Sequence, residues 1–273
     1  MDIYRKIQAF FKDVKTEKVV IGKSVFNRKI FAVKIGQGSP VGLAQYAIHG
    51  REFITAELAL KHYEKGVYKG SLWLIPLSNP DGALLSEVGL ESAGRFIRKK
   101  LIALNGGSKD FSFWKANGRG VDLNVNFDAE WGKGAKNVRF AGAENYIGKK
   151  PFSEPETRAL RNFTQKIRPD YTVSYHTKGE EIYWYFHQSI RTCSRDEALA
   201  KVLSESTGYP LAYAKGSAGG YKDWCIEKLG IPSFTVEAGK DEFTHPLAGE
   251  ECFLDVVNKN AGALYDLSQE YKI

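Results

Sequence analysis

Residues 42–52 read Gly42-Leu-Ala-Gln-Tyr-Ala-Ile48 and then His49-Gly50-Arg51-Glu52, an apolar run followed by two metal-ligand side chains three residues apart. The run is typical of a buried strand, and a helical pattern begins where it ends. Imidazole and carboxylate groups are both good zinc ligands, and a catalytic zinc site needs three protein ligands and one open position. By itself this spacing is weak, because chance produces it in roughly one chain in three of such composition. A third ligand has to come from elsewhere in the sequence.

The pattern around this stretch alternates strands with helices. The chain has 273 residues, 43% of them hydrophobic and 26% charged, which is a globular composition. We therefore predict an α/β fold, a single domain over residues 1–273 with a mixed, largely parallel sheet flanked by helices. Two long irregular stretches are expected to border a cleft. The expected strands are 18–24, 29–35, 42–48, 71–77, 170–175, 181–186 and 232–237; the helices are 1–17, 52–65, 153–167, 194–208, 219–229 and 250–267; the irregular stretches are 82–120 and 128–150.

Charge and cysteine content narrow the class of protein. The formal net charge is +7, with basic residues scattered among 32 acidic ones, which fits anionic substrates better than a nucleic-acid patch. Cys193, Cys225 and Cys252 are odd in number and widely spaced, so we expect reduced thiols. No apolar run reaches the roughly 18 residues of a membrane span, and the first residues lack a secretory signal pattern. The expectation is a cytoplasmic protein, with a spore compartment left open, and the oligomeric state is not predicted.

Three predicted buried strands end in residues that can do chemistry. The first leads to His49 and Glu52, the second to His176 and the third to Glu237. Ligands at the carboxyl ends of neighbouring strands can converge above an open α/β sheet. The sequence thus predicts one zinc ion held by His49, Glu52 and His176, with the Glu237 carboxylate positioned as a base. Two alternatives stay open: His176 could be a core histidine, and Glu237 could pair with Lys240.

These residues and several further motifs occur in the order seen in zinc carboxypeptidases. The chain resembles that family from about residue 18 to its end. The stretch beginning at His176 makes it most similar to the bacterial γ-D-glutamyl-diamino-acid peptidases, which cut cell-wall peptides. The motifs are His49-x-x-Glu52, Asn79-Pro-Asp-Gly82, Arg119-Gly-Val-Asp-Leu-Asn124-x-Asn-Phe127, Ser153-Glu-Pro-Glu-Thr157, His176-Thr-Lys-Gly-Glu-Glu-Ile-Tyr-Trp184, Gly219-Gly-x-x-Asp-Trp224 and Glu237.

The resemblance implies roles for individual residues. It makes His49, Glu52 and His176 the zinc ligands and Glu237 the general base that activates the zinc-bound water. It assigns Arg119 to the developing oxyanion, a role that suits a guanidinium because this group is always charged. The further candidates for substrate binding are Arg51, Asn124, Lys222, Tyr221, Lys178 and Tyr213.

Two departures from the family pattern bear on specificity. Val125 stands where the family keeps the arginine that clamps a substrate's terminal carboxylate, and valine cannot make that contact. Lys222 occupies the position that sets pocket preference in the family, which favours an acidic group such as D-glutamate or diaminopimelate. The family's mobile tyrosine has no clear equivalent, because Lys215 is nearest in register and Tyr213 and Tyr221 lie close by.

The function predicted on this basis is hydrolysis of the γ-D-glutamyl–diaminopimelate amide bond in peptidoglycan-derived acidic peptides. One alternative is a zinc carboxypeptidase that releases C-terminal residues from other peptides, against which Val125 argues. The other is a binding module for wall peptides without catalysis, against which the complete set of ligands and base argues.

Overall fold

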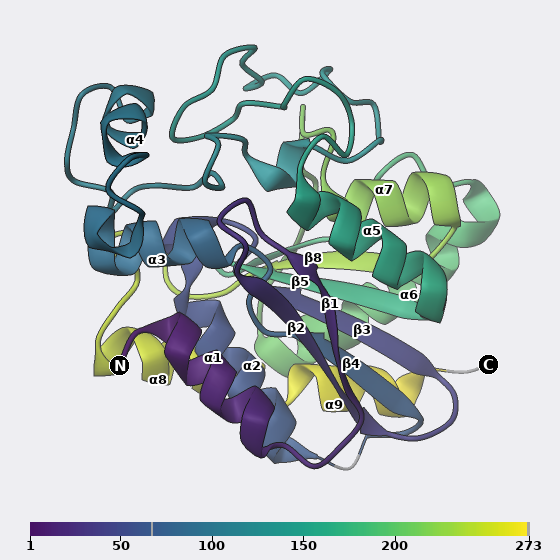
Figure 1. Ribbon diagram of the computed structural model, residues 1–273. Coiled ribbons are helices and arrows are strands. Elements are labelled where there is room, and N and C mark those ends of the chain that lie inside the picture. Colours follow the sequence, from purple (N-terminus) through teal and green to yellow (C-terminus); the bar gives the residue numbers. More distant parts are fainter. Residues whose placement is uncertain (67, 272–273) are drawn as a thin grey trace.

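The structure, a computed structural model, describes residues 1–66 and 68–271. These residues form one domain around a single mixed sheet of eight strands, in the order β1-β2-β4-β3-β5-β8-β6-β7, with helices on both faces (Figure 1). This confirms the predicted α/β architecture. The strands are β1 (Lys18–Lys23), β2 (Lys29–Gly36), β3 (Val41–Tyr46), β4 (Ser71–Ile75), β5 (Tyr171–His176), β6 (Glu181–Tyr183), β7 (Leu211–Ala212) and β8 (Ser233–Glu237).

The centre of the sheet is parallel and its flanks are antiparallel. Strands β4, β3, β5 and β8 run in one direction, whereas β2 pairs antiparallel with β4 and β6 antiparallel with β8. Central strands of this kind are buried on both faces, which explains their continuous apolar sequences. In β3, Leu43 packs into the core on one face, and Ala44 and Tyr46 pack into the core on the other.

More helices pack on one face of the sheet than on the other. On one face the core contains residues of α2, α6, α8 and α9, and on the other it contains residues of α5 and α7. The N-terminal helix α1 packs its buried Ile3 and Ile7 with Phe31 of β2 and residues of α2 and α3, and it is shorter than the predicted 1–17. The helices are α1 (Ile3–Asp13), α2 (Ile54–Lys65), α3 (Pro80–Val88), α4 (Arg98–Leu104), α5 (Pro155–Ile167), α6 (Ile190–Thr207), α7 (Tyr221–Leu229), α8 (Glu250–Asn260) and α9 (Ala263–Glu270).

The stretch 82–120, predicted to be irregular, contains α3, α4 and a short 3-10 helix, Gly89–Ser92. Asn79-Pro-Asp-Gly82 forms the start of α3. The Asn79 side chain accepts a hydrogen bond from the Gly82 N–H at 2.9 Å, and Pro80 occupies the first helical turn, where a missing N–H costs nothing. The same four residue types favour turns and helix starts, and here the following apolar residues pack as a helix.

The C-terminal prediction of one helix over 250–267 is also corrected, because α8 ends at Asn260 and α9 starts at Ala263. The Asn260 carbonyl oxygen accepts a hydrogen bond from His62 Nε2 of α2 at 2.9 Å. Gly262 follows, and glycine is a poor helix former. The remaining differences are smaller: β6 is shorter than 181–186, α6 begins before 194, and β7 was not predicted.

Within residues 1–66 and 68–271, no helix has both the length and the apolar character needed to cross a membrane.

Candidate metal centre and active site

The topology of the sheet brings the predicted ligands together at the carboxyl ends of its central strands. Strands β3, β5 and β8 are neighbours and parallel, so their carboxyl ends lie together. His176 and Glu237 end β5 and β8 and are paired across the two strands. His49 and Glu52 follow β3, with Glu52 in the short 3-10 helix Gly50–Glu52 (η1). Side chains that are far apart in sequence thus share one site, as the order of the strand ends predicted.

Gly50, inside the motif, is required by the packing of this loop. A Cβ atom there would lie 2.5 Å from the Gly82 backbone and 2.7 Å from the Trp114 carbonyl oxygen. The Gly50 N–H also donates to the Lys115 carbonyl oxygen at 2.9 Å. The absence of a side chain therefore lets η1 pack against the start of α3 and against the chain at Lys115.

The three predicted ligands face one another. His49 Nδ1 lies 2.8 Å from Glu52 Oε1, His176 Nδ1 lies 3.0 Å from Glu52 Oε2, and the two Nδ1 atoms are 3.1 Å apart. All three side chains are buried, with residue exposures of 1–5%. Their donor atoms form the one group in residues 1–66 and 68–271 that could hold a metal ion.

This donor set fits zinc. Ligand atoms 2.0–2.1 Å from a tetrahedral zinc ion are about 3.3 Å from one another, close to the separations seen here. His49 Nε2 lies 3.3 Å from Asp122 Oδ1, the arrangement by which a carboxylate fixes the orientation of a metal-ligating imidazole. Two imidazoles and one carboxylate leave a fourth position free, as catalytic zinc sites do.

The protonation states also suit metal binding. Burial would raise the pKa of Glu52, but the imidazoles of His49 and His176 hold it well below its usual range. Burial would raise the pKa of Asp122 too, but Lys115 and His49 lower it. Both carboxylates are therefore ionised at neutral pH, Glu52 as a ligand and Asp122 behind His49.

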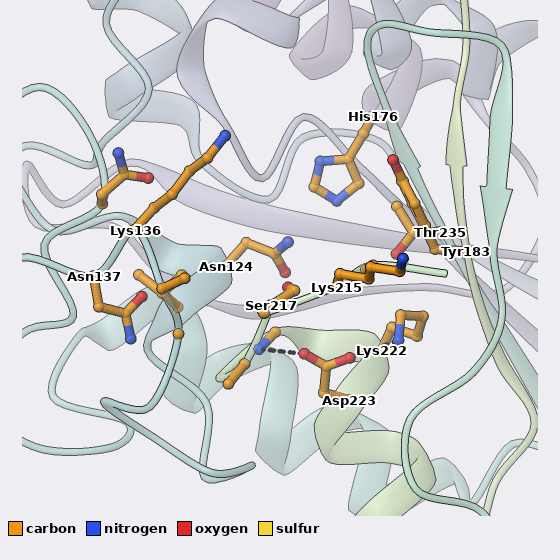
Figure 2. A pocket seen from close by; sticks show the side chains of 18 of the residues that line it. Asn124, Lys136, Asn137, His176, Tyr183, Lys215, Ser217, Lys222, Asp223 and Thr235 are labelled. Atoms are coloured by element: carbon orange, nitrogen blue, oxygen red, sulfur yellow. Dashed lines mark hydrogen bonds and ion pairs between the residues drawn. The ribbon is translucent and has the colours of Figure 1, made fainter. Parts of the chain in front are cut away.

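A cavity of about 410 Å³ is lined by His49, His176 and Glu237. Figure 2 shows His176 among the side chains that line it. Burial and the neighbouring Glu52 raise the pKa of Glu237, although His176 and His49 act against this shift. The predicted alternative for Glu237, an ion pair with Lys240, is not formed, because Lys240 lies 3.7 Å from Asp255. Glu237 is thus an acidic group facing the cavity next to the metal ligands.

Lys115, which sequence reasoning missed, also lines this cavity. Its side chain is only 18% exposed, and its Nζ lies 3.2 Å from Asp122 Oδ2. Burial would lower the pKa of Lys115, but the charges of Asp122 and Glu52 raise it above its usual value, so the ammonium group persists at neutral pH. The sequence gives no local signal for this role. Lys115 lies seven residues before Asp122, and only the fold brings the two side chains together.

Arg119, by contrast, does not line the cavity. Its side chain is 53% exposed and its Nη1 lies 3.6 Å from Glu154 Oε2. The cause is a turn at Asn117, whose side-chain oxygen accepts hydrogen bonds from the Arg119 and Val121 N–H groups. That turn directs Lys115 and Arg119 to different surroundings.

The other predicted substrate residues divide into two groups. Asn124, Tyr213 and Lys222 line the cavity, as does Val125. Tyr221 does not, because its ring is buried in the core and its hydroxyl lies 2.8 Å from that of Thr164. The remaining two predicted residues, Arg51 and Lys178, also lie outside the lining and pair with Glu144 and Asp241.

Comparisons with known proteins agree with this geometry. The family described as "Zinc carboxypeptidase" matches residues 3–252. A curated relative from Lysinibacillus sphaericus, "Gamma-D-glutamyl-L-diamino acid endopeptidase 1", is 33% identical over 246 residues, which cover 83% of this chain and 61% of the relative. "Murein peptide amidase A" from Escherichia coli is 32% identical over 132 residues, or 45% of this chain and 50% of that protein.

Solved structures show the same fold. Bovine thrombin-activatable fibrinolysis inhibitor, bound to a tick carboxypeptidase inhibitor, superposes with a TM-score of 0.75 at 20% identity. The superposition covers 98% of this chain and 96% of that one.

Proposed function

Since the chain belongs to the zinc carboxypeptidase family, we propose that it is a zinc peptidase that hydrolyses the γ-D-glutamyl–diaminopimelate amide bond in peptidoglycan-derived peptides. The observation that carries the proposal is the convergence of His49, Glu52 and His176 beside Glu237 in a cavity rich in lysine. The first relative named above supports the substrate class, although the chain spans only 61% of its length.

His49, Glu52 and His176 would hold the metal. Zinc, when bound in such a site, polarises the substrate carbonyl and lowers the pKa of water, so that a nucleophile is available near neutral pH. The family relationship and the ligand geometry both support zinc as the cofactor.

Glu237 acts as the base and then as the acid. Its carboxylate takes a proton from the attacking water while the water oxygen forms a bond to the γ-carbonyl carbon. The same carboxyl group then gives that proton to the nitrogen of the diamino acid as the amide C–N bond breaks. A pKa raised by burial suits the second step, because it favours the protonated carboxyl group that gives the proton to the leaving nitrogen.

Lys115 is the group we propose for the developing oxyanion, in place of Arg119. It is a largely buried cation that lines the cavity, and its ammonium group is held by Asp122, which also orients His49. A fixed positive charge in a site of low dielectric stabilises a negative charge that appears only in the transition state.

Val125 argues against recognition of a substrate through a terminal carboxylate at this position. It lines the cavity next to Asn124, and its apolar side chain cannot bind a terminal carboxylate there. The charged groups for an acidic substrate are lysines farther along the cavity.

The test is incubation of zinc-loaded protein with the peptide L-Ala-γ-D-Glu-meso-diaminopimelate, followed by mass spectrometry. We expect L-Ala-D-Glu and free diaminopimelate. Glu237→Gln should still bind zinc and fold but should lose at least 1,000-fold in kcat, on the order of a lost catalytic base. An intact peptide with zinc-loaded wild-type protein, or wild-type turnover in Glu237→Gln, would refute the proposal.

A further inference from the structure

The cavity contains four lysines, which fall into two pairs of different character. Deep in the cavity, Lys115 Nζ lies 3.2 Å from Asp122 and Lys222 Nζ lies 2.6 Å from Asp223 Oδ1. In the outer part, Lys136 and Lys215 are exposed and form no ion pair with any residue of 1–66 and 68–271. The two outer lysines are therefore the cations still available to a ligand.

Lys222 is already bound by the protein, which weakens its predicted role in recognising an acidic group. Its ammonium also donates to the Tyr185 carbonyl oxygen at 3.1 Å, and it lies over the Phe186 ring. Asp223 in turn accepts a hydrogen bond from the Gly220 N–H at the start of α7. A substrate carboxylate at Lys222 would have to compete with a buried carboxylate 2.6 Å away.

Lys136 and Lys215 are held on two loops that are joined to each other. The Ala135 N–H donates to the Gly216 carbonyl oxygen at 2.8 Å, so the residues next to the two lysines are in direct contact. Each loop also has an internal hydrogen bond, Asn137 to Gly134 and Lys215 to Tyr213. Figure 2 shows the Lys136 and Lys215 side chains in different halves of the cavity, with Asn124 between them.

We infer that Lys136 and Lys215 form a clamp that binds two carboxylates of one acidic peptide, one at each lysine, and that they set the preference of the site for multiply charged substrates. A ligand that covers these ammonium groups removes water from them, and this is favourable only if it supplies a negative charge to each. The inference rests on the proposed function, because it names the groups that select the substrate of the same site.

The substitutions Lys136→Gln and Lys215→Gln test the clamp on three peptides. The first is L-Ala-γ-D-Glu-meso-diaminopimelate; the second has the α-carboxylate of D-glutamate amidated; the third has L-lysine in place of diaminopimelate and so lacks the distal carboxylate. Each variant should lose about tenfold in kcat/KM on the first peptide, through KM. Each should show no further loss on the one peptide that lacks the carboxylate its lysine binds.

The matched control is Lys149→Gln, which removes the same charge from an exposed position of the same irregular stretch outside the cavity lining. It should behave as wild type on all three peptides, and Lys136→Arg should recover most of the lost kcat/KM. The clamp is overturned if Lys136→Gln and Lys215→Gln match wild type, or if they lose equally on all three peptides.

Binding measurements separate this inference from the proposed function. If the wild-type protein cleaves none of the peptides, calorimetric titration of the zinc-loaded protein with the first peptide still reports on the lysines. A Kd raised about tenfold by each substitution then supports the clamp although the proposed reaction has failed. A Kd that neither substitution changes overturns the clamp.

Discussion

Lys115 and Arg119 are two cations four residues apart, and the structure gives only Lys115 a place beside the metal ligands. Replacement of Lys115 by methionine should lower kcat by roughly 100- to 1,000-fold with a smaller change in KM, because a charge needed in the transition state is lost. Arg119→Met should change kcat less than threefold. Steady-state kinetics on the diaminopimelate tripeptide measures both, and a larger loss in Arg119→Met than in Lys115→Met would reverse our assignment.

Asp122 supports the metal centre without being a ligand. Its Oδ1 lies 3.3 Å from His49 Nε2, and its Oδ2 lies 3.2 Å from Lys115 Nζ. Asp122→Asn keeps the shape but removes the charge, so zinc affinity should fall about 10- to 100-fold. Competition with a chromogenic chelator measures the affinity. A Kd for zinc within twofold of wild type would contradict this role.

The sequence predicts those site residues whose position depends on the local pattern of strands. His49, Glu52, His176 and Glu237 follow apolar runs, and the parallel strands that those runs form place their ends together. Lys115 and Tyr221 could not be predicted in this way. Whether each side chain points to the cavity or to the core depends on a loop turn and on packing between distant residues, here Tyr221 with Thr164.

At the scale of elements, the start of α3 joins three parts of the chain through Asn79. Its side chain accepts from the Gly82 N–H and donates to the carbonyl oxygens of Ile48 and Ala116. Asn79→Ala removes a helix cap and leaves buried polar groups without partners, so the free energy of unfolding should fall by about 2–4 kcal/mol.

Urea denaturation of the zinc-loaded protein measures this loss. Within the described residues, the side chain of the exposed Asn162 of α5 accepts hydrogen bonds from its neighbour Arg161 alone, so Asn162→Ala should cost less than about 0.5 kcal/mol. Equal stability of the two variants would show that Asn79 is not the connection between β3, α3 and the loop at Ala116.

Elements also differ in how well the sequence predicted them. The central strands were predicted correctly because a short, continuous apolar run between polar residues is typical of a strand buried on both faces of a parallel sheet. The break between α8 and α9 was missed although Gly262 lies there; the Asn260 carbonyl oxygen at the end of α8 accepts a hydrogen bond from His62, 198 positions away in sequence. Helices α3 and α4 were missed because glycines in that stretch suggested loops, whereas Gly89 lies just after the end of α3.

For the molecule as a whole, a buried acidic group connects pH with stability. Glu156 is fully buried at the start of α5, where it accepts hydrogen bonds from the Val25 N–H and from Asn117, the residue that shapes the turn after Lys115. Burial, with a further contribution from Asp81, raises the pKa of Glu156 from 4.5 to about 7. The folded protein therefore keeps this proton at pH values where the unfolded chain has lost it.

The sign of the effect follows from proton binding. Between pH 4.5 and about 7 the folded state binds more protons than the unfolded state, so stability falls as pH rises through this window and levels off above it. A shift of this size corresponds to about 3 kcal/mol. Glu156→Gln cannot ionise, so the difference in unfolding free energy between wild type and this variant should change by about 2.5 kcal/mol from pH 5 to pH 8. Urea denaturation at a series of pH values measures it, with exposed Glu242→Gln as the control for charge. If the difference in unfolding free energy between wild type and Glu156→Gln stays constant with pH, Glu156 has the same pKa in the folded and the unfolded protein.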